Sequence, residues 1–319
     1  MSRPLVFVLA WLVTTLAWTQ PYPSKPVRIF VTIGPGAAAD VLTRMVGERL
    51  APRLGAPIVI ENRAGAGGNI AADAVAKSAP DGYTLLMASS STHGANVSVY
   101  PKLPFDPIKD FAPVVLVATN PNVLVVPPSL GVNTLAELLA LAKQKPGELT
   151  YASGGTGTSM HISGEVLAML GGVKLQHIPF RSTPDAINAA LAGEVSMTFA
   201  SAPTAMSQVK AGRLKALGVT SEKPLSSLPE VAPLAAQGLA GFDVSAWFGL
   251  AAPAGTPEPI IKRLNSETLA VLAMPEMREK FVALGMEPLG STPAEFGAFI
   301  RSEIKRLGDV VRASGARVN

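Results

Sequence analysis

Short apolar segments alternate with segments of helical spacing in the first part of this chain, and glycine-rich turns join them. Residues 27–33 are apolar and β-branched, which is typical of a buried strand of the parallel type, and residues 57–61 and 83–88 are predicted as the second and third strands. Between them, residues 38–53 place apolar side chains at helical spacing, and residues 65–77 open on glycines and continue as a helix. This β-α-β-α-β order predicts a parallel, doubly wound sheet.

The second half of the chain repeats this alternation. Strands are predicted at residues 177–180, 195–200 and 214–220, with helical segments between them. A length of 319 residues exceeds one typical core, so we expect two α/β lobes. Two apolar segments would cross between the lobes: residues 114–126, which Asn120-Pro121-Asn122 is expected to break, and residues 244–252. Two crossings would form a hinge, and the cleft between the lobes would be the binding site.

Residues 1–19 have the pattern of an export signal. Arg3 gives a short positive region, an apolar run reaches Ala17, and small residues allow cleavage near residue 19. The run is too short for a comfortable membrane span, and a buried N-terminal helix is the alternative. We therefore expect a periplasmic protein. Its predicted parts are the signal peptide at residues 1–19, lobe 1 at residues 20–119 and 248–319, and lobe 2 at residues 120–247.

Composition excludes several classes of function. The 27 Lys and Arg residues are scattered, so no basic block marks a nucleic-acid footprint. The absence of cysteine excludes disulfides, thiolate metal sites and lipid attachment through an N-terminal cysteine. No later apolar run approaches about 20 residues. We expect a soluble, monomeric mature protein that binds no nucleic acid.

The stretch from Tyr151 to Glu165 carries the strongest indication of a ligand site. A β-prone piece runs into glycines and hydroxyls, and an amphipathic helix opens at about Thr158. Such a junction aims backbone N–H groups at one point, where the helix dipole favours an anion. Other strands end in similar junctions. The residues predicted to bind ligand are Gly34, Pro35, Gly36, Ala37, Ala38, Ser89, Ser90, Thr92, His93, Gly155, Gly157, Thr158, Ser159, His161, Ser182, Thr183, Ala200 and Ser201.

The turn after the first strand also fits part of a dinucleotide fingerprint. Gly34, Gly36 and Ala39 have its spacing, and Glu61 ends the next strand. Pro35, however, lacks the N–H that a pyrophosphate would need, and Glu61 lies farther along than the usual spacing of about 20 residues. An exported protein also meets little NAD. A small-ligand loop or a plain turn is favoured, and no cofactor is expected.

Histidines and serines leave two further alternatives. His93 and His161 with a carboxylate would suit a metal, but no two histidines are at i, i+4 spacing, and we expect no metal. Ser90 with His93, or Ser159 with His161, would suit a hydrolase, but no Gly-x-Ser-x-Gly elbow is present. Hydroxyl-rich loops more often hold ligands or cap helices, so we expect no catalysis. His177 is expected to be an ordinary strand residue.

Several segments, in their order and spacing, carry a family resemblance. They are Tyr22-Pro23-Ser24-Lys25-Pro26, residues 61–69, 79–85, 100–106 and 122–126, residues 151–159 with His161, and residues 247–250 with 253–257. Through them the mature chain resembles, nearly end to end, the Bug proteins. These are the extracytoplasmic substrate-binding receptors associated with tripartite tricarboxylate transporters.

The resemblance implies a fold, a ligand class and partners. The implied fold is an α/β, two-lobed type II periplasmic-binding-protein fold, in which each lobe is a mostly parallel sheet flanked by helices and two crossings form the hinge. Members bind small carboxylates, mainly through backbone N–H groups, hydroxyls and bridging waters. The implied partners are the membrane permease subunits of the transporter, and a sensor kinase is the alternative.

The chain departs from the family at ligand-facing places. In the first loop, Ala37 and Ala39 stand where the family pattern has Gly and Thr, which leaves open how this loop grips its ligand. Residues 181–183, Arg-Ser-Thr, replace the family's Lys-Gly-Ser. Ala200 stands where an acid is common, and an acid there could meet a ligand amine, so an amino-acid ligand is less favoured.

Overall fold

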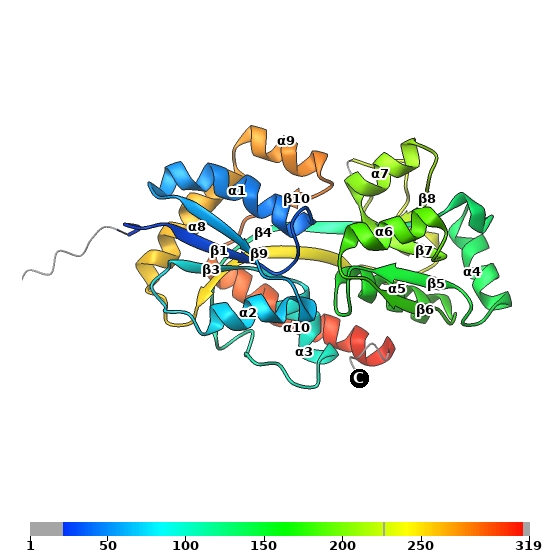
Figure 1. Ribbon diagram of the computed structural model, residues 1–319, viewed down its shortest axis with the longest axis horizontal. Helices are drawn as coiled ribbons and strands as arrows, with labels where there is room; N and C mark the ends of the chain where they lie inside the picture. Colours follow the sequence, from blue (N-terminus) through cyan, green and yellow to red (C-terminus); the bar gives the residue numbers. More distant parts are fainter. Residues whose placement is uncertain (1–21, 226, 315–319) are drawn as a thin grey trace, which may run out of the picture.

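The computed structural model describes residues 22–225 and 227–314 (Figure 1). The strands are β1 (Val27–Val31), β2 (Ile58–Asn62), β3 (Thr84–Ser89), β4 (Phe111–Val126), β5 (Thr150–Ser153), β6 (Gln176–Pro179), β7 (Met197–Ser201), β8 (Lys215–Val219), β9 (Ser245–Pro253) and β10 (Glu287–Pro288). The helices are α1 (Ala38–Leu54), α2 (Asn69–Ala76), α3 (Asn96–Val99), α4 (Leu135–Gln144), α5 (Ser159–Gly171), α6 (Thr183–Ala192), α7 (Ala202–Lys210), α8 (Glu258–Leu272), α9 (Pro275–Ala283) and α10 (Pro293–Ser314). Short turns of helix are η1 (Ala66–Gly68), η2 (Ser91–Ala95), η3 (Pro128–Leu130) and η4 (Ala235–Gln237).

One ten-stranded sheet runs through the molecule in the order β2-β1-β3-β9-β4-β7-β5-β6, with β8 and β10 also paired to β4. β1 is parallel to β2 and β3, and β5 is parallel to β6 and β7. β9 is antiparallel to both of its neighbours, β3 and β4. The predicted α/β class with mostly parallel outer strands is confirmed.

Four of the five residues of β1 are apolar, and the exposed Arg28 is the exception. Val27, Ile29 and Val31 pack into one core with α1, whereas Phe30 packs into another with α2. Successive side chains of a strand point to opposite faces, so a strand covered on both faces needs apolar residues at both. Figure 1 shows α1 and α2 on the two sides of this part of the sheet.

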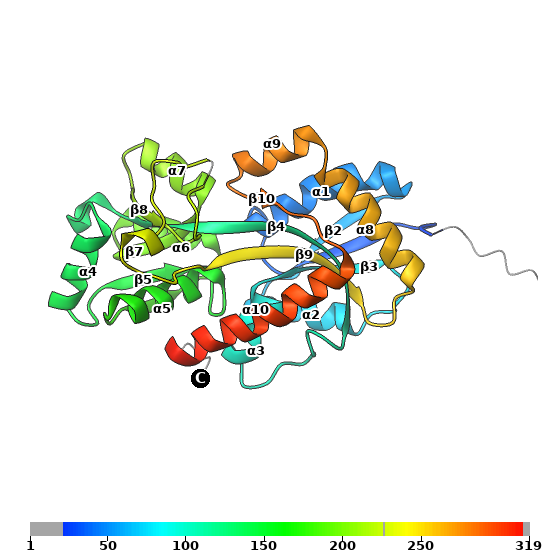
Figure 2. The ribbon, with the colours of Figure 1, turned by 180° about the vertical axis from the view of Figure 1, so that it is seen from behind.

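β4 and β9 run side by side from one half of the molecule to the other (Figures 1 and 2). β4 pairs with β9 from Phe111 to Pro121, and from Asn122 onwards it pairs with β7 and β8. The break expected at residues 120–122 is wrong, because the strand is continuous. Pro121 has no N–H to donate, but it stands where the strand changes partners, and the N–H of Asn122 donates to Oγ1 of Thr220 at 2.9 Å.

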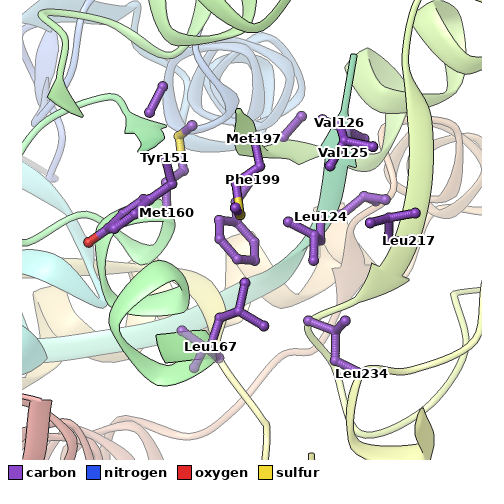
Figure 3. Close-up of a cluster of buried hydrophobic side chains, with 14 of the residues drawn as sticks. Leu124, Val125, Val126, Tyr151, Met160, Leu167, Met197, Phe199, Leu217 and Leu234 are labelled. Atoms are coloured by element: carbon purple, nitrogen blue, oxygen red, sulfur yellow. The ribbon is translucent and has the colours of Figure 1, made fainter. Parts of the chain in front are cut away.

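Each half of the molecule has its own hydrophobic core. One core joins β1, β3 and the first part of β4 to α1, α8 and α9. The other joins the last part of β4 to β5, β7 and α4–α7, with Tyr151 and Phe199 fully buried in it (Figure 3). Burying a side chain as large as Phe199 stabilises the fold by roughly 1.5–3 kcal/mol. The lobe boundaries at residues 120 and 248 stay a prediction.

The last helix reaches farther than expected. From the sequence we expect the C-terminal helices to pack on the first lobe, and Phe296 and Ile300 of α10 pack against Leu116 of β4 and Trp247 of β9. Leu307 and Val311, however, belong to the core of the other half, and α10 passes along α5 (Figure 2). The apolar stripe of α10 is long enough to serve both cores. Neither α10 nor any other described helix has the length and apolar character that would let it span a membrane.

Candidate functional site

A cavity of about 700 Å³ lies between the two halves. Its walls come from the loops that follow β1, β3, β5, β6 and β7, and its floor comes from β4 and β9. The carboxyl ends of parallel strands are where α/β sheets bind ligands, and there the N-terminal ends of the following helices converge. The chain thus builds its main cavity where backbone donors gather.

The loop after β1 gives one wall of the cavity. No side chain caps α1 after Ala37, so the N–H groups of its first turn have no partner of that kind. Asp40 does not line the cavity; it accepts from the N–H of Gly36 and pairs with Arg44 and Asn62 at about 2.9 Å. Burial works to raise the pKa of Asp40, but these partners outweigh it and hold that pKa below its usual range. Asp40 is therefore an anion that braces the turn.

The loop after β3 brings hydroxyls to the same wall. Ser89, Ser90 and Ser91 all line the cavity. The hydroxyls of Ser90 and Ser91 form no hydrogen bond with another described residue, so they are available to a ligand. The neighbouring loop at residues 64–68 is glycine-rich because it passes close to other atoms: a Cβ on Gly68 would lie 2.8 Å from Thr32, and its φ of 92° disfavours other residues.

The junction between β5 and α5 is held by hydrogen bonds inside the protein. Thr158 caps α5: its Oγ1 accepts from the N–H of His161 and donates to the carbonyl of Gly155 at 2.7 Å. The N–H of Gly157 donates to Nδ1 of His161 at 3.1 Å. The N–H of Gly155 donates to Oγ of Ser153 at 3.2 Å. Three groups that we expected at the ligand, the Gly157 N–H, the Thr158 hydroxyl and the His161 ring, are thus engaged within the protein.

Ser159 lines the cavity with a hydroxyl that keeps a free proton, and Thr156 of the same junction lines it too. The Oγ of Ser159 accepts from Nδ2 of Asn122 at 3.1 Å, which leaves the hydroxyl hydrogen to donate elsewhere. The N–H groups of Ser159 and Met160 lie in the first turn of α5 and have no partner within the helix. Together they form a cluster of neutral donors suited to an anion.

The loops before α6 and α7 complete the wall of the second half. Ser182 caps α6 by accepting from the N–H of Asp185, and Thr183 lines the cavity beside it. Ser201 lines the cavity before α7, and its Oγ lies 3.0 Å from Oγ1 of Thr204. These loops therefore add hydroxyls, and the loop before α6 also adds the charge of Arg181.

Arg181 is the one Lys, Arg, Asp, Glu or His side chain among the described residues that line the cavity. It is exposed and forms no ion pair with a described residue. A guanidinium presents five donors and no acceptor, so it suits a carboxylate. The cavity therefore favours anionic over cationic ligands.

Three aromatic rings stack behind the junction. His161 and His177 stack at 4.2 Å, and Tyr151 stacks on His177 at 4.9 Å. Burial, with His177 as a smaller cause, lowers the pKa of His161 to about 3, and burial lowers the pKa of His177 to about 4. His161 is therefore neutral near pH 7, as an Nδ1 that accepts a hydrogen bond must be. His177 lies in β6, as expected, and its Nε2 lies 2.6 Å from Oγ of Ser153.

The paired serines and histidines do not form dyads. Nδ1 of His93 lies 3.0 Å from Oγ1 of Thr92, and the ring packs on Phe111 in a fully buried site. His161 uses Nδ1 for Gly157, and its Nε2 lies 3.8 Å from Oε1 of Glu165. Within residues 22–225 and 227–314, no three His, Cys, Asp or Glu side chains are grouped so that they could hold a metal ion.

The structure brings ten of the predicted residues together on the cavity. They are Gly36, Ala37, Ala38, Ser89, Ser90, Gly155, Thr158, Ser159, Thr183 and Ser201. The other eight do not line it: Gly34, Pro35, Thr92, His93, Gly157, His161, Ser182 and Ala200. Thr92, His93, His161 and Ala200 are buried, and several of the eight support lining residues from behind.

Sequence reasoning missed the floor of the cavity. Asn120 and Asn122 of β4 line it, as do Ala246 and Phe248 of β9. The sequence did indicate these residues, because two asparagines within an apolar segment are unusual. We interpreted Asn120 and Asn122 as a break in the strand instead. It also missed residues on α6 and α7, such as Gln208, because nothing local shows which helix face meets a cavity.

Two α/β halves joined by two strands, with a cavity between them, define a periplasmic-binding-protein fold. Residues 42–316 match the family described as "Tripartite tricarboxylate transporter family receptor". The chain belongs to this family of substrate-binding receptors, and the predicted receptor role and resemblance to Bug proteins are confirmed.

Individual relatives agree with this assignment. The protein BugT of Bordetella pertussis is 37% identical over 298 residues, which cover 93% of this chain and 91% of BugT. The structure of R. palustris Rpa4515 with adipate has a TM-score of 0.89 and 33% identity, covering 93% of this chain and 100% of that one. MatC from Rhodopseudomonas palustris with bound malate has a TM-score of 0.85 and 33% identity, covering 91% and 100%. The family and fold are those of solute-binding proteins, which are not enzymes.

Proposed function

We propose that this protein is a periplasmic receptor that captures a small organic carboxylate in the cavity between its lobes and releases it unchanged. The observation that carries the proposal is the lining: hydroxyls, first-turn N–H groups and Arg181, with no Asp or Glu among the described lining residues. Neutral donors and helix N-termini can hold a carboxylate without a buried, paired Lys or Arg. The adipate on Rpa4515 and the malate on MatC support this ligand class.

The carboxylate would lie at the junction of β5 and α5. There the Ser159 hydroxyl, the first-turn N–H groups of α5 and the opposing Ser90 hydroxyl converge on the cavity. Each hydrogen bond to a charged acceptor contributes roughly 1.5–3 kcal/mol.

The proposal includes movement of the lobes. Lobe 1 would comprise residues 20–119 and 248–319, lobe 2 would comprise residues 120–247, and β4 and β9 would act as the hinge. The proposed signal peptide, residues 1–19, lies outside the described residues. Closure on a ligand would expel water and strengthen the hydrogen bonds inside.

The proposed partners are the membrane permease subunits of a tripartite tricarboxylate-type transporter. The alternative is a sensor kinase that reads the ligand-bound receptor. The two are separated by deleting the receptor gene and measuring uptake of an identified ligand. Lost uptake supports transport, whereas unchanged uptake with a lost transcriptional response supports signalling.

The contacts of the two histidines support the proposed lack of catalysis. His93 contacts Thr92 rather than Ser90, and His161 accepts from Gly157 rather than from Ser159. The rival is an exported hydrolase that uses Ser90 or Ser159. Generic ester substrates test it: turnover that disappears in Ser90→Ala or Ser159→Ala would support the hydrolase and contradict a simple receptor.

Calorimetry and thermal unfolding against a ligand panel test the receptor proposal. The panel holds adipate, malate, benzoate, an amino acid, a sugar and divalent cations. A true ligand raises the melting temperature, because binding to the folded state stabilises it by mass action. At a ligand concentration 100 times its Kd, the free energy of unfolding increases by about 2.7 kcal/mol. If a sugar or metal binds and no carboxylate does, the ligand class is wrong.

A further inference from the structure

Asn120 is a buried carboxamide on the floor of the cavity, and its side chain forms no hydrogen bond with another described residue. It is 3% exposed, lies on β4 opposite Ala246 of β9, and lines the cavity. Its Oδ1 is inaccessible to solvent and accepts no hydrogen bond from a described residue. Buried polar groups are normally paired, and an unpaired one opposes folding. Because Asn120 lines the cavity, a rotation of its amide can bring either polar atom to a group that enters there.

The neighbouring carboxamide is already committed. Asn122 lies two residues farther along β4, on the same face, and its Nδ2 donates to Oγ of Ser159. Ser159 is where the proposed function places the ligand carboxylate. Two residues of a strand span roughly 6.5 Å, so Asn120 lies within reach of a ligand group a few bonds from that carboxylate.

The chemistry of the pairing group follows from what surrounds Asn120. The amide oxygen and nitrogen can exchange places by rotation, so Asn120 can accept or donate. A carboxylate only accepts and an ammonium only donates, and the described residues that line the cavity include no Asp or Glu that could hold an ammonium. A hydroxyl both donates and accepts, so it suits either orientation of the amide.

We propose that Asn120 binds a hydroxyl group of the ligand, so that the receptor prefers a hydroxylated carboxylate to the same acid without the hydroxyl. This inference rests on the proposed function. On β9, Ala246 and Phe248 give the floor beside Asn120 an apolar surface, and the other carboxamide of the floor, Asn122, is bonded to Ser159. A site that is built to bond a hydroxyl discriminates against the analogue that lacks it, because its own polar group is then left unpaired.

Calorimetry with matched acid pairs tests the inference. The pairs are malate with succinate, lactate with propionate, 3-hydroxybutyrate with butyrate, and 4-hydroxybenzoate with benzoate. For the pair that fits the cavity we expect the hydroxy acid to bind at least about tenfold more tightly. In Asn120→Leu, which keeps the branching and the number of side-chain heavy atoms and removes the amide, the two acids should bind within about twofold of each other, mainly through weaker binding of the hydroxy acid.

Asn122→Leu is the matched control. It removes the other carboxamide of the same strand, which supports Ser159 and therefore the carboxylate shared by both acids of a pair. Asn122→Leu should weaken the binding of both acids by the same factor, so the ratio of their two affinities should not change. If Asn120→Leu does not fold, Asn120→Ala replaces it.

The outcomes separate the two proposals. If adipate or another acid binds but no hydroxy acid binds more tightly than its partner, Asn120 pairs with water, this inference fails and the receptor function stands. A preference that persists in Asn120→Leu also overturns it. If no carboxylate binds at all, the proposed function and this inference fail together.

Discussion

The backbone N–H of Gly157 donates to Nδ1 of His161 at 3.1 Å. The His161 side chain, which belongs to α5, therefore holds the loop that precedes α5. The ring can accept only while Nδ1 carries no proton, and burial keeps it neutral by lowering its pKa to about 3. The stacked ring of His177 fixes the orientation of His161. His161 is thus a residue that shapes the binding loop without lining the cavity.

Removing this acceptor should loosen the loop. In His161→Leu the Gly157 N–H loses its partner inside the protein, which costs roughly 1–3 kcal/mol. We expect a lower melting temperature and ligand affinity reduced by about tenfold, since 1.4 kcal/mol corresponds to a factor of ten. Thermal unfolding and calorimetry with the ligand identified in the panel measure both.

His161→Asn is the control for this prediction. Its Oδ1 stands at the same distance from Cβ as Nδ1 and can accept from Gly157, although the stacking on His177 is lost. Affinity should recover to within about threefold of the natural protein. Equal loss of affinity in both variants would show that the ring matters for packing alone.

Part of this junction follows from sequence and part does not. The cap at Thr158 can be predicted, because a hydroxyl at the start of a helix accepts from the N–H of the residue three positions later. The hydrogen bond from Gly157 to His161 cannot be predicted from the local sequence. It depends on the orientation of the His161 ring, which stacking on His177 of another strand imposes. Local patterns place the helix start, whereas contacts between strands decide which donors remain free.

The same distinction explains Asn120. A proline within an apolar segment predicts a break when the strand is considered alone, because Pro121 cannot join a ladder of hydrogen bonds. The sheet tolerates it because β4 changes partners at Asn122. Sequence reasoning therefore found both strand-rich halves and the loops but lost the floor of the cavity.

Gly157→Ala should weaken ligand binding. Gly157 has a φ of 84°, and a Cβ there would lie 2.5 Å from Oδ1 of Asn96, which belongs to the other half of the molecule. Asn96 cannot swing aside easily, because its Nδ2 donates to Gly67 and to Asn69. The clash opposes the contact between the halves, so we expect at least about tenfold weaker binding, measured by calorimetry.

Gly172→Ala separates this clash from backbone strain. Gly172 ends α5 with a φ of 60°, but a Cβ there would meet nothing within 4 Å. Both variants should lose roughly 1–2 kcal/mol of stability, because alanine disfavours the left-handed region. Only Gly157→Ala should lose affinity. Equal affinities in the two variants would contradict a role for the contact with Asn96.

Thr158→Ala and Ser159→Ala should have different effects. The Thr158 hydroxyl is used within the helix cap, so its loss should lower stability by about 1 kcal/mol. The Ser159 hydroxyl keeps a proton for the ligand, so its loss should weaken carboxylate binding by about tenfold with a smaller change in melting temperature. If Ser159→Ala leaves affinity within twofold, the ligand is held elsewhere.

Acid should destabilise the protein through its buried histidines. Burial lowers the pKa of His93 to about 3, and burial followed by the charge of His177 lowers that of His161 to about 3. Unfolded histidines titrate near a pKa of about 6.5, so below that pH the unfolded chain binds more protons than the folded one. The free energy of unfolding should therefore be constant above about pH 7 and fall as the pH drops from about 6.5 towards 3.

Each fully buried histidine should contribute a slope approaching about 1.4 kcal/mol per pH unit in this window, or about 2 kcal/mol between pH 7.5 and pH 5. His93→Leu tests the assignment. It loses the contact with Thr92 and is expected to be less stable at pH 7.5. Its loss of stability on going to pH 5 should nevertheless be about 2 kcal/mol smaller than that of the natural protein. Urea unfolding at the two pH values measures the difference. An unchanged pH dependence in His93→Leu would mean that His93 takes up its proton in the folded state, and that its site admits water.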